Sequence, residues 1–116
     1  MSKQVQTKPA RRSSMALTPA QRMAAQSERA AELLKALSNA QRLRVLCMLA
    51  EAELSVGEIN AGVALSQSAL SQHLSVLREH GLVQTRRDAQ TVYYRLADGP
   101  AKALSATLHD IFCPLP

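Results

Sequence analysis

Residues 65–78 read LSQSALSQHLSVLR, and this stretch decides the fold. Its leucines repeat at helical spacing along one side, at Leu70, Leu74 and Leu77. The spacing predicts an amphipathic helix from Gln67 to about His80, with Ser66 as the N-cap and Gly81 at the end. The opposite side of this helix is polar, so it faces either solvent or a binding partner.

A shorter helix is predicted immediately upstream. Ser55 and Glu58 form the pattern of a capping box, in which each side chain bonds the other residue's backbone N–H. The helix that they open extends to about Ala61, and we expect Gly62 to close it. Two helices joined by such a tight connection are typical of a helix-turn-helix.

Downstream, apolar and polar residues alternate with the period of β-strands. The alternation covers residues 82–86 and 91–96, which flank residues 87–90. This pattern predicts a β-hairpin. A helix-turn-helix followed by a hairpin is the layout of a winged helix-turn-helix.

Three further helices complete the expected fold. One covers residues 18–37, and the next covers residues 39–51 and is apolar on nearly every side, so we expect it at the centre of the protein. A last helix, capped by Asp98 with Pro100 near its start, ends at Cys113. The expected fold class is mainly α with a small β-hairpin, in the order four helices, two strands and one helix.

The composition fits one small domain. The chain has 116 residues, 47% of them apolar, which is enough to bury a single core. Residues 1–17 hold four basic residues and no acid, which predicts a disordered basic tail before a domain at 18–116, with Met15 as an alternative start. No stretch is apolar enough to span a membrane or to act as a secretory signal, so we expect a cytoplasmic protein without a membrane partner.

The charge distribution matters more than the net charge of +5, because residues 18–116 carry ten basic against nine acidic side chains. Polar side chains suited to reading base edges line the predicted helix at Gln67, Ser68, Ser71, Gln72 and Ser75. Arginines suited to phosphates follow at Arg78, Arg86, Arg87 and Arg95. A polar helix face alone is usually just solvated. The hairpin is what favours DNA binding over a protein-interaction module.

Several segments together resemble the ArsR/SmtB family of dimeric bacterial repressors. They are LSNAQRL at 37–43, SVGEI at 55–59, LSQSALSQHLSVLR at 65–78 and YRL at 94–96, and the likeness covers about residues 28–113. The resemblance implies a homodimer held mainly by its first and last helices, which binds an inverted repeat in operator DNA and is released by an inducer. It assigns base reading to Gln67, Ser68, Ser71, Gln72 and His73, and the wing to Arg87, Asp88 and Gln90.

The metal sites of that family are not matched here. Its thiolate site would require cysteines in the short helix, but residues 55–59 contain none. Its site on the last helix requires several ligands, and this chain offers only the adjacent His109 and Asp110. His73 and His80 lie on the predicted reading helix, where a phosphate contact or a helix end is the simpler role. We therefore expect no metal and no cofactor.

Two cysteines, Cys47 and Cys113, are too far apart in sequence for a Cys-x-x-Cys motif. Their positions, with residues 111–113 and Arg86-Arg87, resemble the sulfide- and persulfide-responsive branch of the family. The resemblance implies that reactive sulfur species convert Cys47 and Cys113 to a disulfide or polysulfide bridge within one subunit, and that the protein controls sulfide detoxification genes. A direct disulfide requires Cα atoms within roughly 7 Å, whereas a polysulfide spans more.

Other interpretations of the thiols stay open at this stage. Cys47 in an apolar helix is most simply a small buried hydrophobe. The protein could respond to general oxidants, or act against gene silencing, with the cysteines incidental. A thiol enzyme would require a base or an activating cation near a cysteine, and the sequence shows none, so we expect a regulator and not an enzyme.

Overall fold

The computed structural model describes residues 16–112, and the chain divides into two units between Leu33 and Leu34. Most of the predicted disordered tail, and the predicted sensor residue Cys113, lie outside the described residues. No helix of the described part is long and apolar enough to cross a membrane.

Helix α1 covers Pro19–Leu37 and begins where the sequence predicts. The backbone N–H of Gln21 donates to Oγ1 of Thr18 at 3.0 Å, and the N–H of Thr18 donates to Oε1 of Gln21 at 2.9 Å. These reciprocal bonds satisfy donors that a helix start leaves without partners. Within the first unit, the side chain of Met23 is 70% exposed, so this part of the helix leaves its apolar stripe uncovered.

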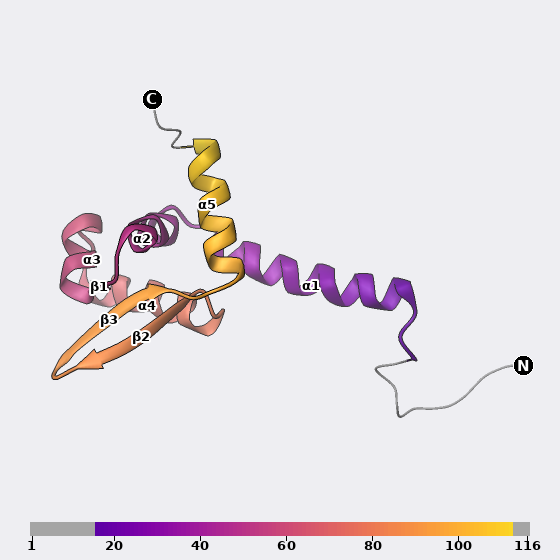
Figure 1. The fold of residues 1–116 in the computed structure, drawn as a ribbon, viewed down its shortest axis with the longest axis horizontal. Helices are drawn as coiled ribbons and strands as arrows, with labels where there is room; N and C mark the ends of the chain where they lie inside the picture. Colours follow the sequence, from indigo (N-terminus) through magenta and orange to yellow (C-terminus); the bar gives the residue numbers. More distant parts are fainter. Residues whose placement is uncertain (1–15, 113–116) are drawn as a thin grey trace, which may run out of the picture. The chain divides into compact units, whose positions relative to one another are not determined.

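The second unit contains all the remaining elements (Figure 1). In chain order they are α2 (Ala40–Glu51), β1 (Leu54–Ser55), α3 (Val56–Val63), α4 (Gln67–Glu79), β2 (Val83–Asp88), β3 (Thr91–Leu96) and α5 (Pro100–Phe112). The strands form an antiparallel sheet in the order β1-β3-β2. The predicted winged helix layout is confirmed, and the sheet gains one short strand, β1, that the sequence did not predict.

Helix α2 and the two helices of the helix-turn-helix, α3 and α4, contribute rows of buried side chains to one core. The rows comprise Val45, Leu46 and Leu49 from α2, Ile59 and Val63 from α3, and Leu70, Leu74 and Leu77 from α4. Val83, Tyr94 and Leu96 close the core from the sheet. Burial of a large aliphatic side chain stabilises a fold by about 1.5–3 kcal/mol. These rows therefore fix which side of α4 is left at the surface.

Helix α2 lies at the centre of the second unit, as its sequence predicts, because it packs against α3, α4, α5 and β3. Its core face is buried, but Leu43 is 36% exposed and Cys47 is exposed as well. The expected central position is confirmed, although one face of the helix is left partly exposed within the described residues. The apolar residues on its second face line a groove instead.

The turn between α3 and α4 also differs from the prediction. Gly62 does not close α3, which continues to Val63 and ends at Ala64 in the left-handed conformation, with φ of 54°. The side-chain amide of Asn60 donates to the carbonyl of Leu65 at 2.9 Å and accepts from its N–H at 2.8 Å. An asparagine side chain thus satisfies the backbone of the turn.

The end of α4 sets the direction of the chain into the wing. The N–H of Leu82 donates to the carbonyl of Leu77 at 2.9 Å, and the N–H of Gly81 donates to that of Arg78 at 3.0 Å. Gly81 has φ of 68°, so this is the glycine-dependent Schellman end that the sequence predicts. Leu77 and Leu82 are both buried, which anchors the junction.

Helix α5 begins without the predicted cap. Asp98 was expected to cap it, but its carboxylate instead accepts from Nζ of Lys102 at 2.8 Å. The carbonyl of Gly99, which has φ of 92°, accepts the first helical bond from Ala103. Only Ala101 of α5 is buried, so most of this helix lies at the surface of the second unit.

Candidate functional site

Helix α4 presents a polar row at the surface. The exposed members are Gln67, Ser68, Ser71, Gln72, Ser75 and Arg78. Ser66 caps the helix, since its Oγ accepts from the N–H of Ala69 at 3.1 Å. Short polar side chains beside an ordered helix N-terminus can donate to phosphates and read base edges in a major groove.

His73 is the exception among the predicted reading residues because it is half-buried. Its Nδ1 lies 3.4 Å from Nη1 of Arg42, and Arg42 also donates to the carbonyls of Ala36 and Lys35. A guanidinium only donates, so Nδ1 of His73 carries the lone pair. His73 therefore ties α4 to α2, and Arg42 in turn ties α2 to the end of α1.

The strand register separates the arginines of the wing. One face of the hairpin, whose inner end is buried in the core, carries the pairs Val83–Leu96, Thr85–Tyr94 and Arg87–Val92. The other face carries the pairs Gln84–Arg95 and Arg86–Tyr93. Arg87 thus continues the core-facing row toward the turn, whereas Arg86 and Arg95 lie on the outer face.

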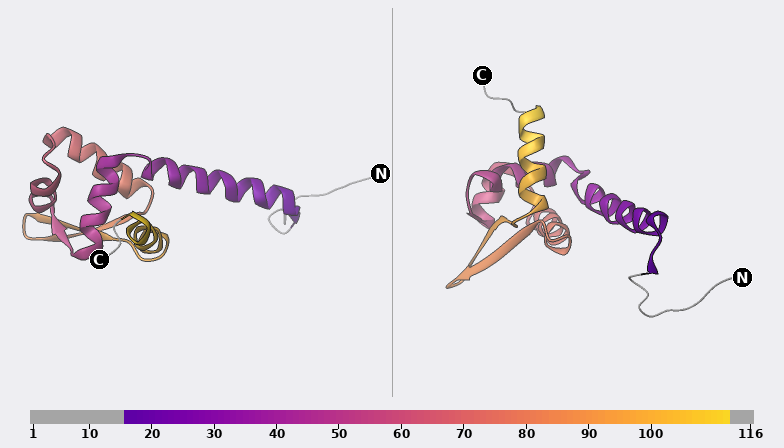
Figure 2. Two further views of the ribbon diagram at one scale, coloured as in Figure 1. Left: turned by 90° about the horizontal axis from the view of Figure 1, so that it is seen from above. Right: turned by 45° about the vertical axis from the view of Figure 1, so that its right-hand side comes forward.

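The turn of the wing is shorter than predicted. Strand β2 extends to Asp88 and pairs with Thr91, so only Ala89 and Gln90 form the turn, and Ala89 has φ of 57°. Figure 2 shows this turn at the end of the sheet remote from α5. Exposed Gln90 therefore lies at the tip of the wing, and Arg87 lies just before it.

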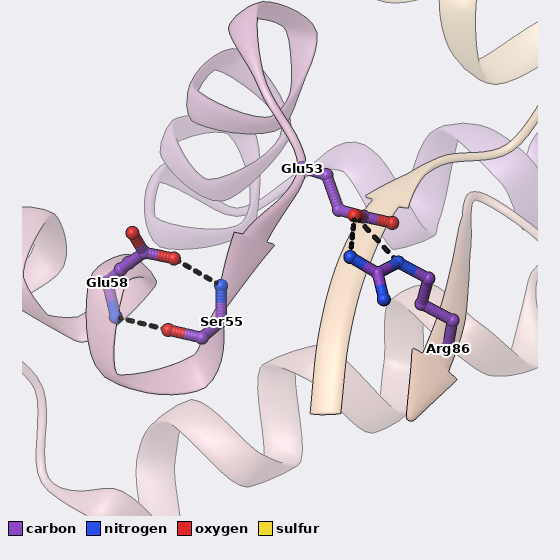
Figure 3. Close-up of polar contacts among 4 residues, drawn as sticks. All are labelled: Glu53, Ser55, Glu58 and Arg86. Carbon is purple, nitrogen blue, oxygen red and sulfur yellow. Dashed lines mark hydrogen bonds and ion pairs between the residues drawn. The ribbon is translucent and has the colours of Figure 1, made fainter. Parts of the chain in front are cut away.

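Arg86 and Arg95, on the outer face of the wing, lie beside different groups. Both Nε and Nη2 of Arg86 lie 2.8 Å from Oε1 of Glu53, as Figure 3 shows. The hydrogen bond with Glu53 raises the pKa of Arg86 above its ordinary value. Arg95 lines a hollow with Lys102 and His109, at the base of the sheet near α5. The four predicted phosphate-binding arginines do not form one cluster.

Cys47 lines a groove of about 340 Å³ between α2 and α5. The groove is mainly apolar, with walls that include Leu43, Leu46, Leu104, Leu108 and Phe112. Arg44 and His109 add polar atoms to its lining. Cys47 is exposed, so it is not the small buried hydrophobe that a cysteine in an apolar helix usually is.

Phe112, on the opposite wall of this groove, directly precedes Cys113 in the chain. The structure thus brings the described part of α5 beside Cys47. The position of Cys113 itself lies outside the described residues, so the pairing of the two cysteines stays a prediction, as do the assigned DNA contacts. Within residues 16–112, no three His, Cys, Asp or Glu side chains lie close enough together to hold a metal ion.

Sequence reasoning missed three polar residues that organise the site. Arg42 joins three helices, Asn60 closes the turn, and Glu53 holds Arg86. Asn60 near the end of a helix carried a detectable signal, because asparagine often bonds to turn backbone. Arg42 and Glu53 carried none, since Arg42 bonds to His73 and to backbone carbonyls of the preceding helix, and Glu53 bonds to a residue 33 positions later.

Comparison with known proteins identifies the family. Residues 39–85 match the arsR family of bacterial regulatory proteins. The transcriptional activator HlyU of Vibrio cholerae is 53% identical over 93 residues, which cover 80% of this chain and 86% of HlyU. The biofilm growth-associated repressor of Xylella fastidiosa is 47% identical over 83 residues, covering 72% of this chain and 73% of the repressor.

Solved structures agree with these sequence matches. Reduced HlyU from Vibrio cholerae superimposes with a TM-score of 0.76 at 53% identity, covering 80% of this chain and 98% of HlyU. A homodimeric winged helix-turn-helix DNA-binding domain from Mycobacterium bovis gives a TM-score of 0.70 at 33% identity, covering 78% and 83% of the two chains. The expectation of a regulator and not an enzyme is confirmed by these relatives. The chain belongs to the ArsR family of bacterial transcriptional regulators.

Proposed function

We propose that this regulator is a homodimeric repressor that leaves its operator when reactive sulfur species join Cys47 to Cys113. The exposed polar row of α4 supports base reading, and the exposure of Arg78 on α4 and of Arg87 on the wing supports contacts with phosphates. Operator DNA is cytoplasmic in bacteria, so the protein acts there. Genes for sulfide detoxification are the proposed targets.

Dimerisation through the first and last helices is supported by their uncovered apolar side chains. Met23 of α1 is 70% exposed, and Ile111 and Phe112 of α5 are 60% and 74% exposed. Large apolar side chains exposed to this extent on a small protein mark association surfaces. The homodimeric state of the related domain from Mycobacterium bovis is consistent with this.

The exposure of Cys47 in the groove beside α5 is the observation that carries the sensor proposal. A thiol must be accessible to react, and it must lie near a second thiol to form a bridge. Cys47 meets the first requirement. Phe112, the residue before Cys113 in the chain, lines the same groove as Cys47, which supports the second requirement. The related HlyU of Vibrio cholerae has been solved in a reduced form, which is consistent with redox chemistry in that protein.

The chemistry balances without a metal. The Cys47 thiolate attacks the outer sulfur of a persulfide RSSH, which gives Cys47–S–SH and releases RS⁻. The Cys113 thiolate then attacks the inner sulfur, which forms the Cys47–Cys113 disulfide and releases HS⁻. If both cysteines are first persulfidated, their reaction gives a trisulfide bridge and releases H₂S.

The bridge would act on DNA binding through α2. This helix packs against α3, α4 and β3, so a covalent link from α2 to α5 constrains the element that supports the reading helix. In a dimer the two reading helices must lie about 34–36 Å apart to enter successive major grooves. A change in that separation releases the operator.

A second candidate function is favoured by the name of one relative. HlyU is a transcriptional activator, whereas the Xylella relative is a repressor. The same DNA-bound dimer would raise transcription if it displaced a silencing protein. A promoter reporter separates the two: deletion of the regulator increases expression under repression and decreases it under activation.

Footprinting on the promoter, with and without a persulfide donor, tests the sensor proposal. Wild type should protect an inverted repeat and lose the footprint on treatment. Cys47→Ser and Cys113→Ser should each protect the same bases and keep the footprint. Normal release of either single variant would contradict the proposal.

A further inference from the structure

The outer face of the sheet carries a cluster of three side chains that spans all its strands. Glu53 lies just before β1, Tyr93 is on the central strand β3, and Arg86 is on β2. The Arg86 guanidinium donates twice to Oε1 of Glu53, at 2.8 Å from both Nε and Nη2. Its central carbon lies 4.6 Å from the centroid of the Tyr93 ring. Figure 3 shows the two charged side chains reaching toward each other across the sheet.

This cluster connects the two edge strands of the sheet, which share no backbone hydrogen bonds with each other. β1 is only two residues long and pairs with β3 through Leu54 and Ser55. β2 is the opposite edge of the sheet, and β3 separates it from β1. The Glu53–Arg86 contact therefore joins the two edges directly, over the ring of Tyr93. A cation stacked on an aromatic ring and bonded to a carboxylate has a fixed direction.

The same contact changes what Arg86 offers to DNA. Binding of a cationic side chain to a phosphate is favourable mainly because it releases a counterion. The carboxylate of Glu53 already neutralises Arg86, so moving Arg86 to a phosphate would leave Glu53 without its cation and close to the DNA. Side chains of Arg86 and Glu53 are 54% and 29% exposed, so the pair is accessible to solvent and its strength is moderated by salt.

Arg87 provides an internal comparison. It is the next residue in the chain, it is exposed, and it points to the opposite face of the sheet. Within the described part of the chain, Arg87 makes no ion pair. Two adjacent arginines on one strand thus differ in whether their charge is already neutralised.

We propose that Glu53 is a positioning residue of the wing: it holds Arg86 against Tyr93, so that Arg86 braces the hairpin while Arg87 neutralises a DNA phosphate. The inference rests on the proposed function, because it requires DNA at the wing. It assigns different roles to two residues that sequence alone treats as equivalent. It also links the wing to the segment directly after α2, the helix that carries Cys47.

The salt dependence of DNA binding tests this assignment. The full chain is titrated against a fluorescent duplex of mixed sequence over a series of salt concentrations, and the logarithm of the binding constant is plotted against that of the salt concentration. Arg87→Gln should reduce the slope by about 0.9 for each wing on the DNA. Arg86→Gln should weaken binding at every salt concentration with an unchanged slope. Glu53→Gln should steepen the slope, because it frees the charge of Arg86.

A double variant excludes a merely structural explanation. In the Glu53→Gln background, Arg86→Gln should now reduce the slope by about 0.9 for each wing, although it has no effect on the slope in the wild type. Circular dichroism checks that each variant is folded, and Glu53→Ala, which also removes the carboxylate, replaces Glu53→Gln if that variant does not fold.

The outcomes separate this inference from the proposed function. Equal loss of slope in Arg86→Gln and Arg87→Gln would overturn the positioning role of Glu53 while leaving DNA binding intact. An unchanged slope in Glu53→Gln would overturn it as well. Absence of salt-dependent DNA binding by the wild type would contradict the proposed function, and the inference with it.

Discussion

A Cβ atom at Gly62 would lie 2.5 Å from Cε and 2.8 Å from Sδ of Met48, so α3 packs against the end of the Met48 side chain of α2, and any larger residue there must displace that flexible end. The glycine lies within α3 and not at its end, and its missing side chain leaves space for the end of Met48. Because α3 and α4 share the short turn at residues 64–66, this contact also sets where the reading helix lies relative to α2.

Substitution Gly62→Ala should stabilise the protein less than a gain in helix propensity of about 1 kcal/mol would by itself, because the added methyl must displace the end of the Met48 side chain. Urea denaturation followed by circular dichroism measures the change. Gly57→Ala in the same helix is the matched control, since a Cβ there comes no closer than 4.0 Å to Ser55 Oγ. The control should stabilise the protein by up to about 1 kcal/mol through helix propensity. Equal effects of the two substitutions would show that the Met48 contact does not constrain the helices.

The capping box of α3 should make stability depend on pH. The hydrogen bond from the Ser55 backbone, followed by that from the Ser55 side chain, lowers the pKa of Glu58 below its ordinary value of 4.5. At pH values between the lowered pKa of the folded chain and 4.5, the unfolded chain binds more protons at Glu58 than the folded chain does. The contribution is therefore complete above pH 4.5 and is lost as the pH falls through the lower folded pKa.

Glu58→Gln isolates that contribution, because glutamine can form the same capping box without a titrating group. Urea denaturation at a series of acidic pH values should show a shallower loss of stability in this variant than in wild type. Asp98→Asn should also remove part of the acid dependence, since the ion pair with Lys102 lowers the pKa of Asp98. Parallel pH profiles for wild type and Glu58→Gln would contradict the role given to the capping box.

Gln72 on the surface of α4 should contribute to sequence discrimination. A bidentate contact between glutamine and adenine is worth about 1–3 kcal/mol of discrimination, so Gln72→Ala should weaken operator binding by about 10- to 100-fold and change binding to a mixed-sequence duplex much less. The operator for this measurement is selected from a pool of random duplexes. Gln84→Ala, at an exposed position on the outer face of β2, is the control and should change neither affinity. Equal losses on both duplexes would remove Gln72 from the reading residues.

The sequence predicted those parts of the fold that depend on local chemistry. Helix starts at Thr18 and Ser55, and the glycine end at Gly81, follow from bonds between residues three to five positions apart. The leucine row of α4 predicted which side is buried, and therefore which side is available to DNA. Local propensity and periodicity were sufficient for these features.

Features that depend on distant partners could not be predicted in this way. β1 is two residues long and exists because β3, about 40 residues later, pairs with it. Gly62 has a sequence context that suits a helix end, but the position of Met48 decides its role. Arg86 and Arg87 look alike in the sequence. Only the register of the sheet and the position of Glu53 distinguish them.

The bridge between Cys47 and Cys113 is tested most directly by mass spectrometry of the persulfide-treated protein, digested without reduction. We expect one linked pair of peptides that contains the two cysteines. A disulfide-linked pair is lighter than the two free peptides together by two hydrogen atoms, and a trisulfide-linked pair is heavier than the disulfide by one sulfur atom. A mixture of ordinary and nitrogen-15-labelled chains should give linked peptides of a single label, because the link forms within one subunit. Persulfidation of Cys47 without any link to Cys113, or links that join the two labels, would contradict the account.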